Sequence, residues 1–556
     1  MAAFDFVVVG AGSAGCVLAA RLTEDPDVRV LLVEAGTRDE RQVLPVPALM
    51  ARQFMSATDW GYFTEPEPGL DGRIVYWPRG KGIGGTFLMN GHVYVRGDRA
   101  DFDAWAELGN DGWDYESVLP YFRRSERRRG APSPYHGSDG PLPVADLRDP
   151  NPLTHAFVDA AVGVGIARLD DLNQPHLDGV GYLQVHQQRG ARRTTAHSHL
   201  RAAMARPNLV VETGALTTRV LLDGTRATGV EYRRDGVVVQ AHARREVVLC
   251  AGVVNSPQVL LLSGIGPAGE LGPLGIPVAL DLPGVGRNLQ DHAGVAVVES
   301  ITEPISLMRG ESLADIARYA VLRKGPLTSN VTEAAAFVRT RPGLASPDLE
   351  LAFSPIGMSP RRLFDGPTAW AKNRLRPIVK PDRRNVVHGM IIAAVAATPR
   401  SAGAVTLESP DPAVPPRIAP GYLSDADGDD LRVLVEGIRL ARRIFRQPAL
   451  ARYTDRELQP GDDVEADDEL VAFLRAQTQT AHHGAGTCRM GTDPDAVVDT
   501  ELRVRGISGL RVVDASVMPR IVSGHPNAAT IMIAEKAADL LRKVPGVRRS
   551  SRAGTS

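Results

Sequence analysis

Short apolar runs separated by glycine-rich turns recur along this chain, and the clearest example lies at its start. Residues 4–9 (FDFVVV) form an apolar run, GAGSAG follows, and a second apolar run (VRVLLVEAG, residues 28–36) comes after a helical segment. A strand, a glycine turn, a helix and a second strand in this order predict a β-α-β unit. We therefore expect an α/β fold for this part of the chain.

Three glycines mark the turn of this unit. Gly10 permits the tight turn, Gly12 lets the backbone approach a pyrophosphate, and Gly15 lets the helix pack on the strand. Glu34 ends the second strand, at the position of an acid that hydrogen-bonds a ribose hydroxyl. Together these features predict a dinucleotide site. The turn alone does not distinguish NAD from FAD.

The apolar pattern changes twice along the rest of the chain. Residues 208–250 are rich in strand patterns, with turns at LDGTRATG and RRDG. From about 300 to 480, helical patterns such as DLRVLVEGIRLARRIF mix with short β runs, which predicts a second domain. Residues 510–545 return to a buried strand (GLRVVDAS) and a helix (NAATIMIAEKAADLLRKV), and we expect the tail 546–556 to be disordered.

Length and composition limit the classes of protein. A chain of 556 residues exceeds the ~250–300 that one core supports, so two domains are expected. The net charge of −1 gives no global reason to expect a nucleic-acid or membrane partner, and no apolar run reaches the ~18–20 residues of a membrane span. The start lacks the basic leader of a signal peptide, and the 3 dispersed cysteines show no metal-ligand spacing, so we predict a cytoplasmic protein.

Six segments of the chain, in order, resemble the glucose–methanol–choline (GMC) flavin oxidoreductases, with choline dehydrogenase and aryl-alcohol oxidase types among them. The segments are VVVGAGSAGCVLAARL, RGKGIGGTFLMNGHVYVRGDRADFDAW, CAGVVNSPQVLLLSGIGP, LPGVGRNLQDH, HHGAGTCRMG and RVVDASVMPRIVSGHPNAATIMIAEKAADLL. The resemblance implies an α/β fold with a Rossmann-like FAD-binding domain assembled from discontinuous segments, and a substrate-binding domain around an antiparallel sheet. We assign 1–300 and 481–545 to the first and 301–480 to the second, with part of 145–200 a candidate for the substrate side.

The resemblance also implies that the cofactor is FAD and which residues hold it. Glu34 would meet the adenosine ribose, Val220 the adenine through its backbone, and Asn527 the flavin. The full set that the resemblance assigns to FAD is Gly10, Gly12, Ser13, Ala14, Gly15, Glu34, Ala35, Gly84, Gly85, Asn90, Gly91, Val93, Val220, Asp514, Ala515, Pro526 and Asn527. Some relatives bind FAD covalently through a histidine where this chain has Met89. A thioether is a poor candidate for that bond, so we predict non-covalent FAD.

Two histidines occupy the catalytic positions of the family. His483 stands three residues before the Gly486-Thr487 pair, and His525 lies in SGHPNAAT. A neutral imidazole suits general-base chemistry near neutral pH, and a second imidazole can orient the same oxygen and stabilise alkoxide charge. We therefore expect His483 to be the base and His525 its hydrogen-bond partner, with the two titrating as a coupled pair. The neighbouring His482 is expected to line the substrate cavity.

Three features depart from the family pattern or have no assigned role. Phe87 stands where relatives carry a small hydroxyl residue, and His92 where they often carry methionine; we expect His92 to be a packed side chain. The stretch 361–384 is strongly basic, either as a solvated loop or as a lid for an anionic substrate or an acidic electron-transfer partner.

The resulting interpretation is an FAD-dependent alcohol dehydrogenase or oxidase. It would convert a primary or secondary alcohol, with benzylic and allylic alcohols among the candidates, to a carbonyl compound by hydride transfer to flavin N5. The electron acceptor would be oxygen, a quinone or a redox protein. The main alternative is a hydroxynitrile-lyase-like enzyme in which FAD is not used for redox turnover. An NAD-dependent dehydrogenase and a catalytically silent binding protein are further alternatives.

Overall fold

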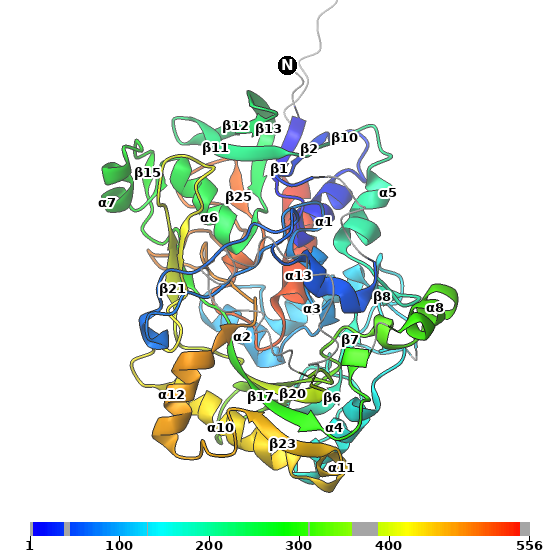
Figure 1. The fold of residues 1–556 in the computed structure, drawn as a ribbon. Coiled ribbons are helices and arrows are strands. Elements are labelled where there is room, and N and C mark those ends of the chain that lie inside the picture. The colour runs from blue at the N-terminus through cyan, green and yellow to red at the C-terminus, as the bar shows by residue number, and fades with distance from the viewer. Residues whose placement is uncertain (1–3, 38–44, 131, 310–311, 358–386, 545–556) are drawn as a thin grey trace, which may run out of the picture.

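The computed structural model describes residues 4–37, 45–130, 132–309, 312–357 and 387–544 (Figure 1). Two sheets organise these residues, one in the upper and one in the lower half of the view in Figure 1. The basic stretch 361–384 lies outside the described residues.

The first sheet has seven strands and includes the β-α-β unit with the glycine turn predicted to bind a dinucleotide. Its strands are β1 (Phe4–Val9), β2 (Val30–Val33), β10 (Leu209–Glu212), β11 (Ala215–Asp223), β12 (Arg226–Arg234), β13 (Val237–Leu249) and β25 (Leu510–Val512). The order is β10-β2-β1-β13-β12-β11, with β25 also on β13; β10, β2, β1, β13 and β25 are parallel and β11 to β13 antiparallel. All six residues of β1 are buried, as expected for a strand covered on both faces.

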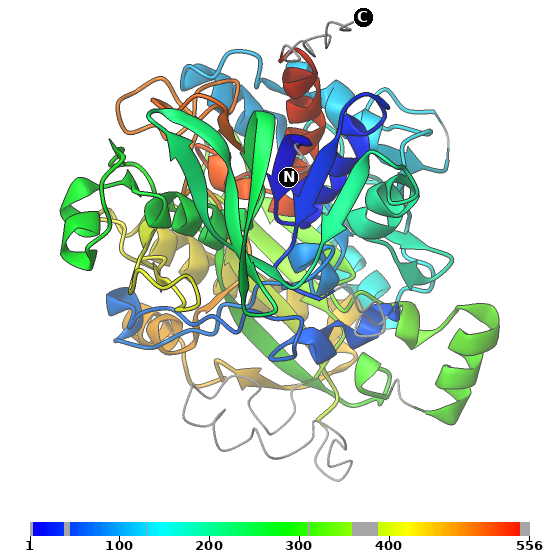
Figure 2. The ribbon, with the colours of Figure 1, turned by 90° about the horizontal axis from the view of Figure 1, so that it is seen from above.

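Helices that are distant in the sequence cover the first sheet. The helices of this half are α1 (Ser13–Leu22), α2 (Arg99–Glu107), α3 (Tyr115–Ser125), α5 (Arg201–Ala203), α6 (Gly252–Leu262), α7 (Ala268–Leu271) and α13 (Pro526–Arg542). Helix α13 packs on α1 and α3, and Figure 2 shows it (red) beside the blue N-terminal segment. The two ends of the chain therefore pack together around the first sheet, which confirms a fold assembled from discontinuous segments.

The second sheet is antiparallel and has six strands. They are β17 (Ala293–Ile301), β18 (Ala334–Val338), β19 (Leu349–Ser354), β20 (Gly389–Ala396), β23 (Thr454–Gln459) and β24 (Gln479–Thr480), in the order β18-β19-β20-β17-β23 with β24 on β17. The helices α4 (Pro152–Gly163), α10 (Asp429–Phe445), α11 (Pro448–Ala451) and α12 (Asp467–Gln477) share its apolar core. Helix α8 (Leu313–Leu322) projects at the side of the molecule (Figure 1).

The fold class predicted from the sequence is confirmed, and one element differs in extent. The second strand, predicted over 28–36, is paired only over Val30–Val33, because its neighbour β1 ends at Val9, opposite Val33. The boundaries at residues 300 and 481 stay predictions.

Candidate active site

A cavity of about 500 Å³ is lined by residues from both sheets. At one end, Gly10, Glu34 and Thr217 line it, from the turn and strands of the first sheet. At the other end, Ala352 of β19 and Ala393 of β20 line it, from the antiparallel sheet. One continuous space thus connects the dinucleotide-binding turn with the second sheet.

Most residues that the sequence assigns to FAD line this cavity. They are Gly10, Gly12, Ser13, Ala14, Glu34, Ala35, Gly85, Asn90, Gly91, Val93, Asp514, Ala515, Pro526 and Asn527. Gly15, Gly84 and Val220 do not line it. A Cβ on Gly15 would lie 1.9 Å from the Gly10 carbonyl oxygen, so this glycine serves close packing of helix on strand. The Val220 amide donates to Ser263 Oγ at 2.8 Å, while Thr217 of the same strand faces the cavity.

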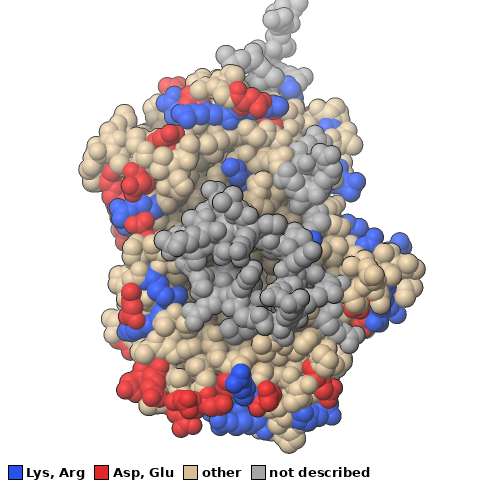
Figure 3. Space-filling model, viewed as in Figure 1, with Lys and Arg blue, Asp and Glu red and all other residues tan. Residues whose placement is uncertain are grey.

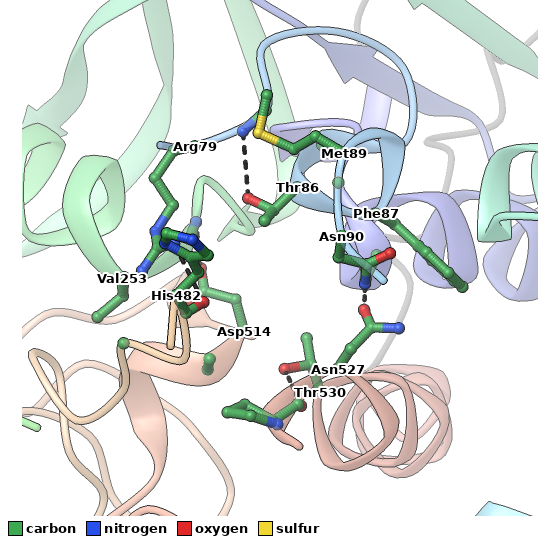
Figure 4. Close-up of a pocket in the computed structure, with 18 of the residues that line it drawn as sticks. Arg79, Thr86, Phe87, Met89, Asn90, Val253, His482, Asp514, Asn527 and Thr530 are labelled. Atoms are coloured by element: carbon green, nitrogen blue, oxygen red, sulfur yellow. Dashed lines mark hydrogen bonds between the residues drawn. The ribbon is translucent and has the colours of Figure 1, made fainter. Parts of the chain in front are cut away.

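The residues present at this end of the cavity fit FAD. Glu34 accepts hydrogen bonds from the amides of Ala11 (2.8 Å) and Gly36 (2.7 Å), and burial raises the pKa of its carboxyl. The N-terminus of α1 has no side-chain cap, which leaves its first amides to an anionic group. The side chain of Asn527, near Asn90 in Figure 4, has a buried Nδ2 without a partner among the described residues. Such a donor suits a flavin carbonyl.

The two predicted catalytic histidines come together in the cavity, from elements far apart in the sequence. The ring of His483, in the loop after β24, lies 4.5 Å from the ring of His525, at the N-cap of α13. His483 Nδ1 lies 2.9 Å from Nδ1 of a third histidine, His292, which is fully buried. The Nε2 atom of His483 makes no hydrogen bond to any described residue. Since His483 lines the cavity, this atom is available to a molecule bound there.

A carboxylate from the antiparallel sheet holds the second histidine. Glu350 of β19, only 2% exposed, lies 3.1 Å from His525 Nε2 through its Oε1 atom. A carboxylate accepts, so His525 Nε2–H donates to it. Within the described part of the chain His525 Nδ1 has no protein partner, and this atom is also left to the cavity.

The loop that carries His483 is fixed by Asp291. The Oδ1 atom of Asp291 accepts the amide of His483 at 2.7 Å. Its Oδ2 atom accepts from Thr480 Oγ1 at 2.5 Å, Tyr422 hydroxyl at 2.6 Å and Trp77 Nε1 at 3.0 Å. Four hydrogen bonds thus hold this buried carboxylate, and through the amide of His483 it fixes the position of that histidine.

Burial keeps the imidazoles of His483, His292 and His482 neutral. The pKa of His483 is lowered well below its ordinary value, mainly by burial and then by His525 and His292. Burial likewise lowers the pKa of His292 to about 4 and that of His482 to about 4. A neutral His483 can accept a proton throughout the physiological pH range.

His482 and His92, which had no firm role, now have defined surroundings. His482 has a φ of 66° and lines the cavity, with its ring 6.0 Å from that of Phe54 and its carbonyl accepting from Arg79 at 3.1 Å (Figure 4). The left-handed backbone turns two adjacent histidines toward the same cavity.

His92 is fully buried between Gln187 (2.9 Å) and Arg192 (3.3 Å) while also lining the cavity wall.

Sequence reasoning missed three residues of this site. Asp291 and His292 belong to the LQDH segment that carries the resemblance, but no role was attached to them. Glu350 had a weaker signal, an acid inside the apolar run LELAFS. A carboxylate within an otherwise buried strand needs a partner, and this requirement could have marked it as a site residue.

Comparisons with known proteins found a matching family and similar sequences. Two family models, both described as GMC oxidoreductase, match residues 4–294 and 399–534. The chain is 45% identical over 543 residues to an uncharacterized GMC-type oxidoreductase of Mycobacterium tuberculosis (strain ATCC 25618 / H37Rv), covering 97% of this chain and 99% of the relative. It is 42% identical over 559 residues to mitochondrial choline dehydrogenase of Mus musculus, covering 98% and 90%.

A solved structure extends the similarity to three dimensions. Pyridoxine 4-oxidase from Mesorbium loti superposes with a TM-score of 0.85 at 32% sequence identity. The match covers 96% of this chain and 98% of that chain, so both halves of the fold are included.

Proposed function

Because the chain belongs to the GMC oxidoreductase family and FAD is the cofactor of that family, we propose that it oxidises a primary or secondary alcohol to a carbonyl compound. The observation that carries the proposal is the pair His483 and His525, with rings 4.5 Å apart in the cavity that also holds the dinucleotide-binding residues. Two of the similar proteins, choline dehydrogenase and pyridoxine 4-oxidase, are named for compounds that carry hydroxyl groups.

In this reaction the side chains of the protein accept the proton of the substrate hydroxyl and hold its oxygen. FAD, when bound, supplies the acceptor for the hydride that leaves the carbinol carbon with its electron pair. The O–H proton passes to Nε2 of His483, and the C=O bond forms. To hold the same oxygen as a donor, His525 would carry a proton on Nδ1 as well as on Nε2, and Glu350, which accepts from Nε2–H, would stabilise the positive charge of this ring. Asp291, through the amide of His483, keeps the base in place.

The base requires one particular tautomer of His483. Only one of the two facing Nδ1 atoms of His483 and His292 can carry the shared proton. When His483 Nδ1–H donates to His292, the Nε2 lone pair of His483 faces the cavity and can accept the substrate proton. We assign this tautomer, so His292 acts as a positioning residue for the base.

The walls around the histidines favour an apolar alcohol. Met50, Phe54 and Trp60 line the cavity on one side, and Ala352 and Ala393 on another. Apolar and aromatic walls with a few polar groups are typical of sites for small apolar ligands. This supports a substrate in which the alcohol is joined to an unsaturated or aromatic group.

We also propose that FAD is held without a covalent bond, because Met89, which lines the cavity, offers only a thioether. The cytoplasmic location and the two domain boundaries stay predictions.

An anaerobic titration of the purified yellow protein tests the proposed function. Benzyl alcohol, a hydroxy acid, choline and a sugar are added in turn while the absorbance of oxidised flavin is recorded. We expect bleaching by at least one alcohol, and admission of air then separates an oxidase (rapid recovery) from a dehydrogenase (slow recovery). A flavin that stays oxidised with every alcohol, in a protein that cleaves cyanohydrins, would establish the lyase alternative.

A further inference from the structure

Helix α8 turns its apolar side chains toward solvent. The exposed fractions are 86% for Leu313, 48% for Ile316 and 80% for Val321. Positions 313, 316, 317, 320 and 321 follow the i, i+3, i+4, i+7, i+8 spacing of one helix face, and Ala317 and Ala320 are also exposed. A surface helix normally buries such a face against the core, so the orientation of α8 is reversed.

The opposite face fixes the helix in this orientation. Tyr319 is only 6% exposed, and its hydroxyl donates to the Gly190 carbonyl at 3.1 Å. At the N-terminus, Ser312 caps the helix by accepting the amide of Asp315 at 3.0 Å. The polar contacts of α8 are therefore directed inward, and the apolar stripe is what remains outside.

Exposed basic side chains surround this stripe. They are Arg148, Arg189, Arg318, Arg323 and Lys324. Arg318 pairs with Asp149 at 2.9 Å, whereas the other four make no ion pair with any described residue. Figure 3 shows blue atoms around the tan projection at the side of the molecule where α8 lies. The region is thus apolar at its centre and positively charged at its rim.

We propose that α8 docks the protein on an anionic phospholipid surface. An exposed apolar helix face flanked by arginine and lysine is the composition of helices that lie in the interface of anionic membranes. A second copy of the chain fits less well, because a stable interface needs about 20–30 residues a side and two like-charged rims would repel. No helix in the described ranges is long and apolar enough to cross a membrane, so the contact is peripheral.

Two short helices link helix α8 to the wall of the cavity. Helix α8 contacts the short helix η8 (Pro326–Thr328), which packs on η2 (Pro47–Gln53). Met50 of η2 lines the cavity. Docking through α8 would therefore place a wall of the cavity near the lipid surface, within reach of apolar compounds dissolved there.

Vesicle binding of the intact holoenzyme tests the proposal. Sedimentation with vesicles of phosphatidylcholine containing 30 mol% phosphatidylglycerol is compared with pure phosphatidylcholine vesicles, at low and high salt. We expect binding to the anionic vesicles that weakens with salt. The double variant Ile316→Glu/Val321→Glu should lower the vesicle partition coefficient by about 10-fold or more, since two buried apolar groups are lost. Arg323→Gln/Lys324→Gln should reduce the salt dependence.

A matched control uses the exposed valines of the β12–β13 hairpin. Val237 and Val238 are 60% and 56% exposed, and Val237→Glu/Val238→Glu should leave vesicle binding unchanged. Flavin absorbance and melting temperature confirm that each variant is folded. The proposal is overturned if the unmodified protein does not bind anionic vesicles, or if Ile316→Glu/Val321→Glu binds them as well as Val237→Glu/Val238→Glu does. It is also overturned if sedimentation velocity shows a dimer that Ile316→Glu/Val321→Glu dissociates, because the stripe would then serve a second copy.

Discussion

Replacing Glu350 by glutamine tests whether the negative charge next to His525 is needed, because the size and shape of the side chain stay nearly the same. The amide keeps the size of the side chain and can still accept from His525 Nε2, which lies 3.1 Å from Oε1 in the native protein. The substitution removes the negative charge that would stabilise a protonated His525 imidazole. A hydrogen bond to a charged group contributes about 1.5–3 kcal/mol, so if this stabilisation is needed in the transition state, flavin reduction should slow roughly 10- to 100-fold.

Stopped-flow reduction of the oxidised enzyme under anaerobic conditions measures this effect directly. The limiting reduction rate should fall in Glu350→Gln, while FAD content and the apparent affinity for the alcohol change little. Glu333→Gln is the matched control, because Glu333 is equally buried at 1% but is bound by Ser329 and Thr154 and does not line the cavity. Equal reduction rates in Glu350→Gln and the unmodified enzyme would refute the assigned role of Glu350.

Three further predictions concern the histidine cluster and the cofactor. His292 is neutral when folded, with a pKa lowered from 6.5 to about 4, so its contribution to stability is full above pH 6.5 and is lost as the pH falls toward 4. The pKa shift of His292 corresponds to about 3 kcal/mol of unfolding free energy. The difference in unfolding free energy between pH 7 and pH 5, measured by chemical denaturation, should therefore be smaller in His292→Gln than in the unmodified protein. Because the pKa of His483 lies well below 6.5, the limiting rate of flavin reduction should be level between about pH 6 and 8; a loss of rate over this range would contradict a neutral base. Acid precipitation should release the yellow cofactor into the supernatant, and a yellow pellet would show covalent attachment.

Much of the fold could be predicted because its signals are local. The apolar run of β1 and the glycines after it define a strand and a turn within a few residues, and Phe4–Val9 is the strand found. Short motifs singled out His483 and His525, and the structure brings these two histidines together in the cavity. The extent of β2 was overestimated, because the sequence pattern does not show that its neighbour β1 ends at Val9, opposite Val33.

The supporting residues of the site could not be derived from local pattern. Glu350 and His525 are 175 residues apart in the sequence, and His292 and His483 are 191 apart. The first contact joins β19 to the start of α13, and the second joins the residue before β17 to the loop after β24. No local periodicity specifies either. Val220 shows the same limit within one strand: the strand was recognised, but the residues of β11 that line the cavity are Ala215, Leu216 and Thr217.

The most direct test of the proposed chemistry is anaerobic flavin reduction in His483→Gln, with the alcohol that bleaches the unmodified enzyme. Glutamine keeps a polar side chain in the cavity but cannot accept the hydroxyl proton as a base. We predict that the variant binds FAD and shows its normal oxidised spectrum, while the limiting rate of reduction falls by roughly 10²- to 10⁴-fold. Reduction at the rate of the unmodified enzyme would contradict the account, because the hydroxyl proton would then leave by a route that does not involve His483.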